Sequence, residues 1–121
     1  MLEQRSKELK VGIAAVQEQR ARSLAIAAGT RTREADEPNV WFPSVTAMAR
    51  VLSDENMALF KVVRDQQPDS MDTLAKVVGK HAPNVSRSLH AMAEFGLVTF
   101  IKNGRTVMPQ ATFEHLSVQF C

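Results

Sequence analysis

The spacing of helix-capping and helix-ending residues in the second half of the chain most constrains its fold. Ser70 is a favourable N-cap and Gly79 is a favourable stop, so residues 71–78 are predicted to form a short helix. Pro83 suits the first turn of a second helix, which we expect to end just before Gly96. The sequence therefore predicts two helices joined by a tight turn.

A β-hairpin is predicted directly after this second helix. Residues 97–101 read LVTFI, a run rich in β-branched and aromatic side chains that predicts a strand. Asn103-Gly104 is the strongest short hairpin signal, so Thr106–Met108 is the expected return strand, ended by Pro109. Helix, tight turn, helix, strand, turn and strand together predict an α+β fold, a winged helix-turn-helix in which the hairpin is the wing.

Further helices precede this unit. Ser44 and Ser53 are candidate N-caps for helices ending near Leu52 and Gln66. Close to the end of the chain, apolar and polar residues alternate over 115–120, a pattern typical of a half-buried strand. We therefore predict that residues 44–121 form the winged helix-turn-helix domain, with a three-helix core and a β-hairpin wing.

The first part of the chain is predicted to lie outside that domain. Residues 3–28 are rich in helix-forming residues and contain no proline, so residues 1–29 are expected to hold an extra N-terminal helix and a dimerisation arm. Residues 30–43 are read as a linker with an apolar anchor, although Val40-Trp41-Phe42 could be a short strand. The helix could instead pack on its own domain, and the C-terminal strand could form the dimer. The expected dimerisation residues near one face of the helix are Leu9, Ile13, Val16 and Leu24.

One face of the helix predicted over 83–95 has the chemistry of base recognition. At 100° per residue, Val85, Leu89 and Met92 fall within about 60° of one another and should be buried. Arg87 then points the opposite way, where it could contact a guanine, and Asn84 could contact an adenine. The buried stripe thus predicts an outward polar face suited to the major groove.

The distribution of charge also indicates that the region around this helix contacts nucleic acid. The chain has 15 Lys+Arg and 13 Asp+Glu, a net charge of only +2, yet the stretch from Gly79 to Arg105 contains four basic residues and one acidic residue, Glu94. Such a local excess favours contacts with phosphates. The complete set of expected DNA-binding residues is Lys80, His81, Asn84, Ser86, Arg87, His90, Lys102, Asn103 and Arg105.

Other classes of function lack their signals in this sequence. There is no apolar run near the ~18 residues of a membrane span, and the first ten residues are too charged for a secretory signal. The one cysteine, Cys121, excludes a disulfide within one chain and a multi-cysteine zinc site. His81 and His90 are nine positions apart, without a neighbouring cysteine or paired carboxylates, so no metal site is expected. The use of a single cysteine is typical of a protein of the reducing cytoplasm. With no phosphate-binding loop, nucleophile elbow or triad, we expect a protein that is not an enzyme and needs no cofactor.

Four segments resemble a known group of proteins: Phe42-Pro43-Ser44, DSMDTLA at 69–75, PNVSRSL at 83–89 and EFGLV at 94–98. They are similar to the small, broadly MarR-like winged-helix regulators of bacteria and archaea, especially short regulators encoded on plasmids or beside toxin genes. The resemblance covers about two-thirds of the chain and leaves residues 1–39 outside. It implies a recognition helix over 83–95 and a homodimer on double-stranded DNA.

Two functions follow from these observations. The first is a sequence-specific regulator, a repressor or an antitoxin-type autorepressor with a cognate toxin as a further partner, that reads the major groove with 83–95 and phosphates with 102–105. The alternative is a winged helix that binds proteins and never touches DNA. A steep dependence of binding on salt would distinguish DNA binding from the alternative.

Overall fold

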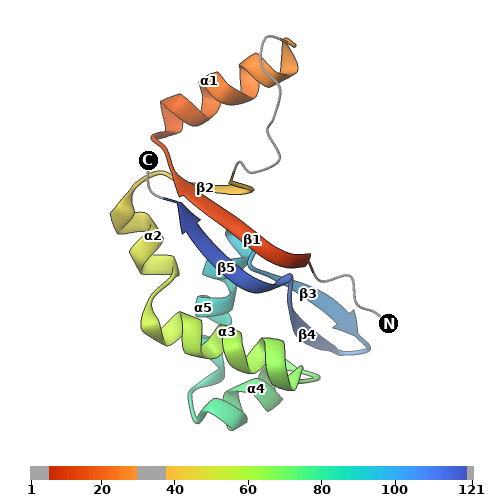
Figure 1. Ribbon diagram of the computed structural model, residues 1–121. Coiled ribbons are helices and arrows are strands. Elements are labelled where there is room, and N and C mark those ends of the chain that lie inside the picture. Colours follow the sequence, from red (N-terminus) through yellow and green to blue (C-terminus); the bar gives the residue numbers. More distant parts are fainter. Residues whose placement is uncertain (1–5, 30–37, 120–121) are drawn as a thin grey trace.

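The computed structural model describes residues 6–29 and 38–119 and shows a mixed α+β architecture (Figure 1). The helices predicted after residue 44 are all present, and strands flank them on both sides. In chain order the described elements are β1 (Ser6–Ile13), α1 (Val16–Ala27), β2 (Val40–Phe42), α2 (Val45–Val51), α3 (Asp54–Gln66), α4 (Met71–Val78), α5 (Ala82–Glu94), β3 (Val98–Asn103), β4 (Thr106–Ala111) and β5 (Phe113–Gln119).

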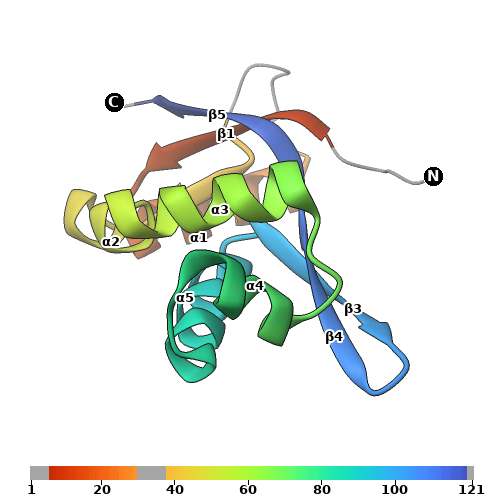
Figure 2. The same ribbon diagram turned by 90° about the horizontal axis from the view of Figure 1, so that it is seen from below.

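The strands form two small sheets. One is a parallel sheet in the order β2-β1-β5, in which Val11 at the centre lies opposite Val40 on one side and Val118 on the other. The second is the antiparallel pair β3-β4. Because β1 and β5 are parallel neighbours, the first and last described strands lie side by side, with the start of β1 beside the start of β5 (Figures 1 and 2).

Local sequence signals account for the helix ends. Ser44, Ser53 and Ser70 each accept a hydrogen bond from the backbone N–H three residues later, at 3.0–3.1 Å, which satisfies an amide that the first helical turn leaves unpaired. Gly79 and Gly96 adopt positive φ angles of 69° and 80°, a conformation that favours glycine. Gly79 ends α4, and Gly96 follows the last residues of α5. The predicted caps and stops are confirmed.

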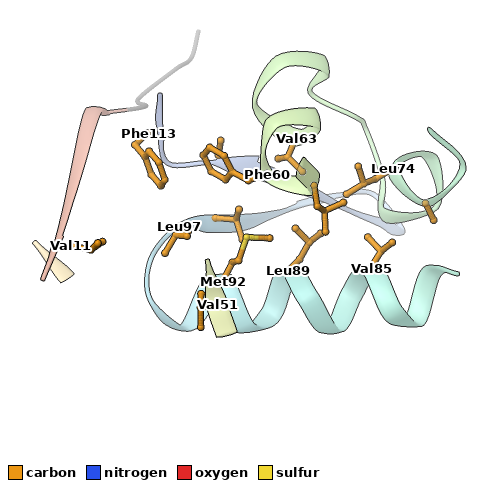
Figure 3. Packing of buried hydrophobic residues seen from close by; sticks show 14 of the residues in the cluster. Val11, Val51, Phe60, Val63, Leu74, Val85, Leu89, Met92, Leu97 and Phe113 are labelled. Atoms are coloured by element: carbon orange, nitrogen blue, oxygen red, sulfur yellow. The ribbon is translucent and has the colours of Figure 1, made fainter. Parts of the chain in front are cut away.

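The predicted buried stripe of α5 is also confirmed. Val85, Leu89 and Met92 are at most 1% exposed, and their side chains point towards Val63 of α3 and Leu74 of α4 (Figure 3). Full burial of such a side chain stabilises the fold by about 1.5–3 kcal/mol. This packing fixes which face of α5 remains outside.

The prediction of one helix over 3–28 is wrong. Residues 6–13 form strand β1, and α1 begins only at Val16. Pairing on both edges of β1 overrides the helical propensity of these residues, because Val11 becomes completely buried. The glycine at position 12 also fits the strand, since an added Cβ would lie 2.8 Å from the Cγ of Pro38 and 2.9 Å from the Trp41 ring.

The predicted dimerisation stripe is therefore not a single helical face. Leu9 and Ile13 lie in β1, where Leu9 packs against the core. Val16 and Leu24 lie on α1 and are 51% and 70% exposed. The four residues belong to two elements with different periodicities, so any dimer must use them differently from the predicted helix pair.

The predicted division at residue 43 also needs correction. Residues 30–37 of the expected linker lie outside the described residues, while Val40–Phe42 forms β2, an edge strand of the parallel sheet. Phe42 is fully buried and its ring lies 4.4 Å from that of Phe95. Both β1 and β2 thus share the core of the later residues.

The return strand of the hairpin is longer than predicted. It continues through Pro109, which lies opposite Phe100, to Ala111. A two-stranded ribbon tolerates a proline because alternate amides along each strand have no partner strand to face. No helix within 6–29 or 38–119 has the length and apolar character needed to cross a membrane.

Candidate nucleic-acid interface

Helices α4 and α5 are joined by a turn that the backbone holds closely. The amide of Lys80 donates to the carbonyl of Ala75 at 3.0 Å, and Gly79 supplies the left-handed conformation at the end of α4. Helix α5 begins at Ala82 with a proline in its first turn. Figure 2 shows α4 and α5 together below α3, with the β3-β4 hairpin extending on one side.

The face of α5 opposite the buried stripe carries the predicted recognition residues. Asn84 and Arg87 are exposed and Ser86 is half-buried. The guanidinium Nη1 of Arg87 donates to Oδ1 of Asn84 at 3.3 Å. Together they form an exposed group of hydrogen-bond donors on the first two turns of the helix. The outward orientation of Asn84 and Arg87 is confirmed, and their contact with DNA stays a prediction.

His90 lies one turn further along the same face and contacts the hairpin. Its ring stacks on Phe100 of β3 with the centroids 4.6 Å apart and the planes 26° apart. Its Nδ1 lies 2.8 Å from the backbone carbonyl oxygen of Ser86 and 3.3 Å from the Ser86 hydroxyl. The sequence did not reveal this contact, which links α5 directly to the hairpin.

The hairpin presents its polar residues on two different faces. Val98 and Phe100 share the face of β3 that packs on the core, and alternation places Lys102 on that same face, towards the side of α5. Asn103 lies on the opposite face, and its carbonyl accepts a hydrogen bond from Thr106 at 2.8 Å. Lys102 is therefore the hairpin cation that the register places on the side of α5.

Arg105 and His81 occupy the two turns of this region. Arg105 is exposed beside Gly104, whose φ is 66°. His81 is the N-cap residue of α5, but its side chain makes no capping hydrogen bond, and it is exposed. Each side chain is accessible where the chain reverses direction.

Lys80 forms an ion pair that the sequence analysis did not predict. Its Nζ lies 2.6 Å from Oε2 of Glu55 in the first turn of α3. The hydrogen bond from Lys80, followed by its positive charge, lowers the pKa of Glu55 below its ordinary value. Both side chains are well exposed, at 43% and 70%, so a phosphate would compete with Glu55 for this ammonium group.

Lys76 is a further candidate for the nucleic-acid interface, and the sequence analysis did not include it. With Asp72, Lys80 and His81 it lines an open hollow of about 480 Å³ at the junction of α4 and α5. A count of basic residues that begins at Gly79 excludes it. The signal that could have found it is its position four residues before Lys80, in the last turn of α4.

The two histidines of this region lie in different turns of the chain around α5. His81 precedes the first turn of α5 and His90 lies in its third turn. Within residues 6–29 and 38–119, no three His, Cys, Asp or Glu side chains are grouped as a metal ion would require.

Comparison with known proteins adds a family. No curated protein matches this chain. Residues 51–118, more than half of the chain, match the family HVO_A0114. The match extends from the end of α2 into β5 and contains every residue of the candidate interface described above. The chain therefore belongs to the HVO_A0114 family.

Proposed function

We propose that this protein is a sequence-specific DNA-binding transcriptional regulator with a winged helix-turn-helix. In this proposal α4 supports α5, α5 enters the major groove, and the β3-β4 hairpin is the wing. The observation that carries the proposal is the exposure of Asn84 and Arg87 opposite the buried residues of α5, with Lys102 on the hairpin face towards that helix. These groups are suited to base edges and phosphates.

In this proposal the protein acts in the cytoplasm as a homodimer, and it needs neither catalysis nor a cofactor. Two copies would place their α5 helices one DNA turn apart, roughly 34 Å, on a palindromic site. Blocking a promoter would make the protein a repressor, or an autorepressing antitoxin if a toxin is its second partner. Sedimentation with and without a duplex tests the 2:1 stoichiometry.

Substitution of Arg87 tests the base-reading role of α5. Selection from random duplexes supplies the site, and Arg87→Ala is then expected to weaken binding to it by about 1–3 kcal/mol and to relax preference at one base pair. Arg20→Ala is the matched control, because Arg20 is exposed on α1 at the opposite end of the molecule (Figure 1). Equal affinity and selectivity of Arg87→Ala and wild type would exclude Arg87 from the recognition residues.

The hairpin is tested by the salt dependence of binding. Replacing Lys102 or Arg105 with alanine should weaken binding to all duplexes alike and reduce the slope of log K against log salt by about 0.9 for each phosphate that the variant no longer neutralises. An unchanged slope in both variants would show that the hairpin does not contact phosphate.

A protein-binding role is the second candidate, and apolar side chains on the hairpin favour it. Ile101 and Val107 are 40% and 37% exposed, and a wing that only contacts phosphate has no need of them. The register places them on opposite faces of the hairpin, Ile101 opposite Met108 and Val107 opposite Lys102. If either face binds a protein and the chain has no role on DNA, the affinity for duplexes should be weak and should not depend on residues of α5. If the Ile101→Ser variant binds the selected duplexes as tightly as wild type, the DNA-binding proposal is favoured.

A further inference from the structure

His90 has a hydrogen bond that determines where its proton lies. The Nδ1 atom is 2.8 Å from the carbonyl oxygen of Ser86, a distance typical of a hydrogen bond. A carbonyl oxygen can only accept, so Nδ1 must carry the proton and donate it. The Ser86 hydroxyl, 3.3 Å away, lies beside the same nitrogen. In the neutral imidazole, Nε2 is then left with its lone pair.

The ring is also restrained by the hairpin. Phe100 stacks on it with a centroid separation of 4.6 Å, and Phe100 itself packs against the hydrophobic core. A ring held by a carbonyl on one edge and by an aromatic ring on one face has little rotational freedom. Since His90 is exposed, its Nε2 is a restrained acceptor on the outer side of α5.

This acceptor complements the donors one turn earlier. Arg87 can only donate, and Oδ1 of Asn84 already accepts from Arg87 at 3.3 Å. The amide NH2 of Asn84 and the remaining guanidinium N–H groups are donors. His90 follows Arg87 by three residues, about 4.5 Å along the helix axis. The outer face of α5 thus changes from donors at Arg87 to an acceptor at His90.

We propose that Nε2 of His90 accepts a hydrogen bond from the exocyclic amino group of an adenine or a cytosine. This inference rests on the proposed function and specifies the base chemistry of the same site. In the major groove the donors on base edges are the amino groups of adenine and cytosine, whereas guanine and thymine present acceptors. An Nε2–H tautomer would instead donate a hydrogen bond to an acceptor on a base edge. Phe100 is a positioning residue that acts through His90.

The tautomer is measured first, in the free protein. Nitrogen-15 chemical shifts of the His90 ring at alkaline pH should show the Nδ1–H form. Phe100→Ala should move these shifts towards an average of the two tautomers, while Phe100→Tyr, which keeps the stacked ring, should leave them unchanged. A predominant Nε2–H form in the wild type would overturn the proposal, whatever the protein binds.

Base preference is measured next, by selection from random duplexes followed by titration. Wild type should prefer A or C at one position near the base pair that Arg87 reads, by roughly threefold to tenfold over G and T, as expected for one hydrogen bond. His90→Ala should lose that preference alone. Comparing the A and C duplexes, and then a duplex in which purine replaces the selected adenine or pyrimidin-2-one replaces the selected cytosine, identifies the amino group.

The possible outcomes separate the two proposals. If no duplex is bound, both the proposed function and this inference fail. If duplexes are bound but G or T is selected at that position, or if His90→Ala keeps the preference, only this inference fails. Phe100→Ala with weakened discrimination at the same base pair, rescued in Phe100→Tyr, supports the positioning role.

Discussion

The orientation of α5 can be tested by stability alone, with Leu89→Ala. Leu89 is completely buried on the α5 face that points towards α3 and α4 (Figure 3). The substitution removes three carbons, at about 0.8 kcal/mol each, and the cavity left behind raises the expected loss to about 3–5 kcal/mol. This is a large share of the roughly 5–15 kcal/mol that stabilises a typical domain. Urea unfolding followed by circular dichroism measures the loss.

The matched control is Glu94→Ala on the same helix. Glu94 is exposed, so its replacement should change the free energy of unfolding by no more than about 0.5 kcal/mol. If Leu89→Ala were as mild as Glu94→Ala, with an unchanged dependence on urea, the buried stripe would be wrong. The outward orientation of Arg87 would then lose its support.

Three further predictions concern other parts of the fold. Gly12→Ala should destabilise the protein by about 1–3 kcal/mol, because its Cβ would collide with Trp41, and the fluorescence of this single tryptophan should shift; unchanged stability and emission would contradict that packing. Ser70→Ala should cost about 1 kcal/mol in thermal unfolding through loss of the cap; a melting temperature equal to that of wild type would refute the cap. Because Lys80 lowers the pKa of Glu55 below 4.5, their pairing stabilises the fold above that pH and is lost as the pH falls, so Glu55→Gln should flatten the acid side of the stability curve, and an unaltered acid side would exclude a role for the pair.

The sequence predicted those helix ends and turns that depend on interactions between residues close together in the chain. Ser44, Ser53 and Ser70 act through hydrogen bonds to amides three residues away, and Gly79 acts through its own backbone conformation. Each capping hydrogen bond and each positive φ angle depends on only a few consecutive residues. Helices α2 to α5 and the β3-β4 turn were therefore predictable.

Strand β1 was not predictable, because its partners are remote in sequence. Residues 6–13 have ordinary helical propensity, and only pairing with β2 and β5 makes a strand more stable. The one local sign was Gly12, which weakens a helix but does not identify a strand. The stripe that joined Leu9 to Leu24 failed for the same reason.

In the candidate interface, periodicity predicted exposure but not pairing. The helical repeat placed Arg87 and His90 outside, as the structure shows for both. It could not show that Lys80 meets Glu55 or that His90 stacks on Phe100, because those contacts join different elements. Sequence thus predicts which side chains are accessible, and tertiary structure decides which of their polar atoms remain free.

The pairing of β1 with β5 has a consequence for biosynthesis. Ser6 lies opposite Phe113, so the central strand emerges from the ribosome long before its partner is translated. Closing so long a loop is entropically costly and slow, whereas α4, α5 and the hairpin make contacts between sequence neighbours. We expect the helical unit to assemble first during translation and the parallel sheet to close last, which leaves β1 exposed to chaperones for most of the synthesis of the chain.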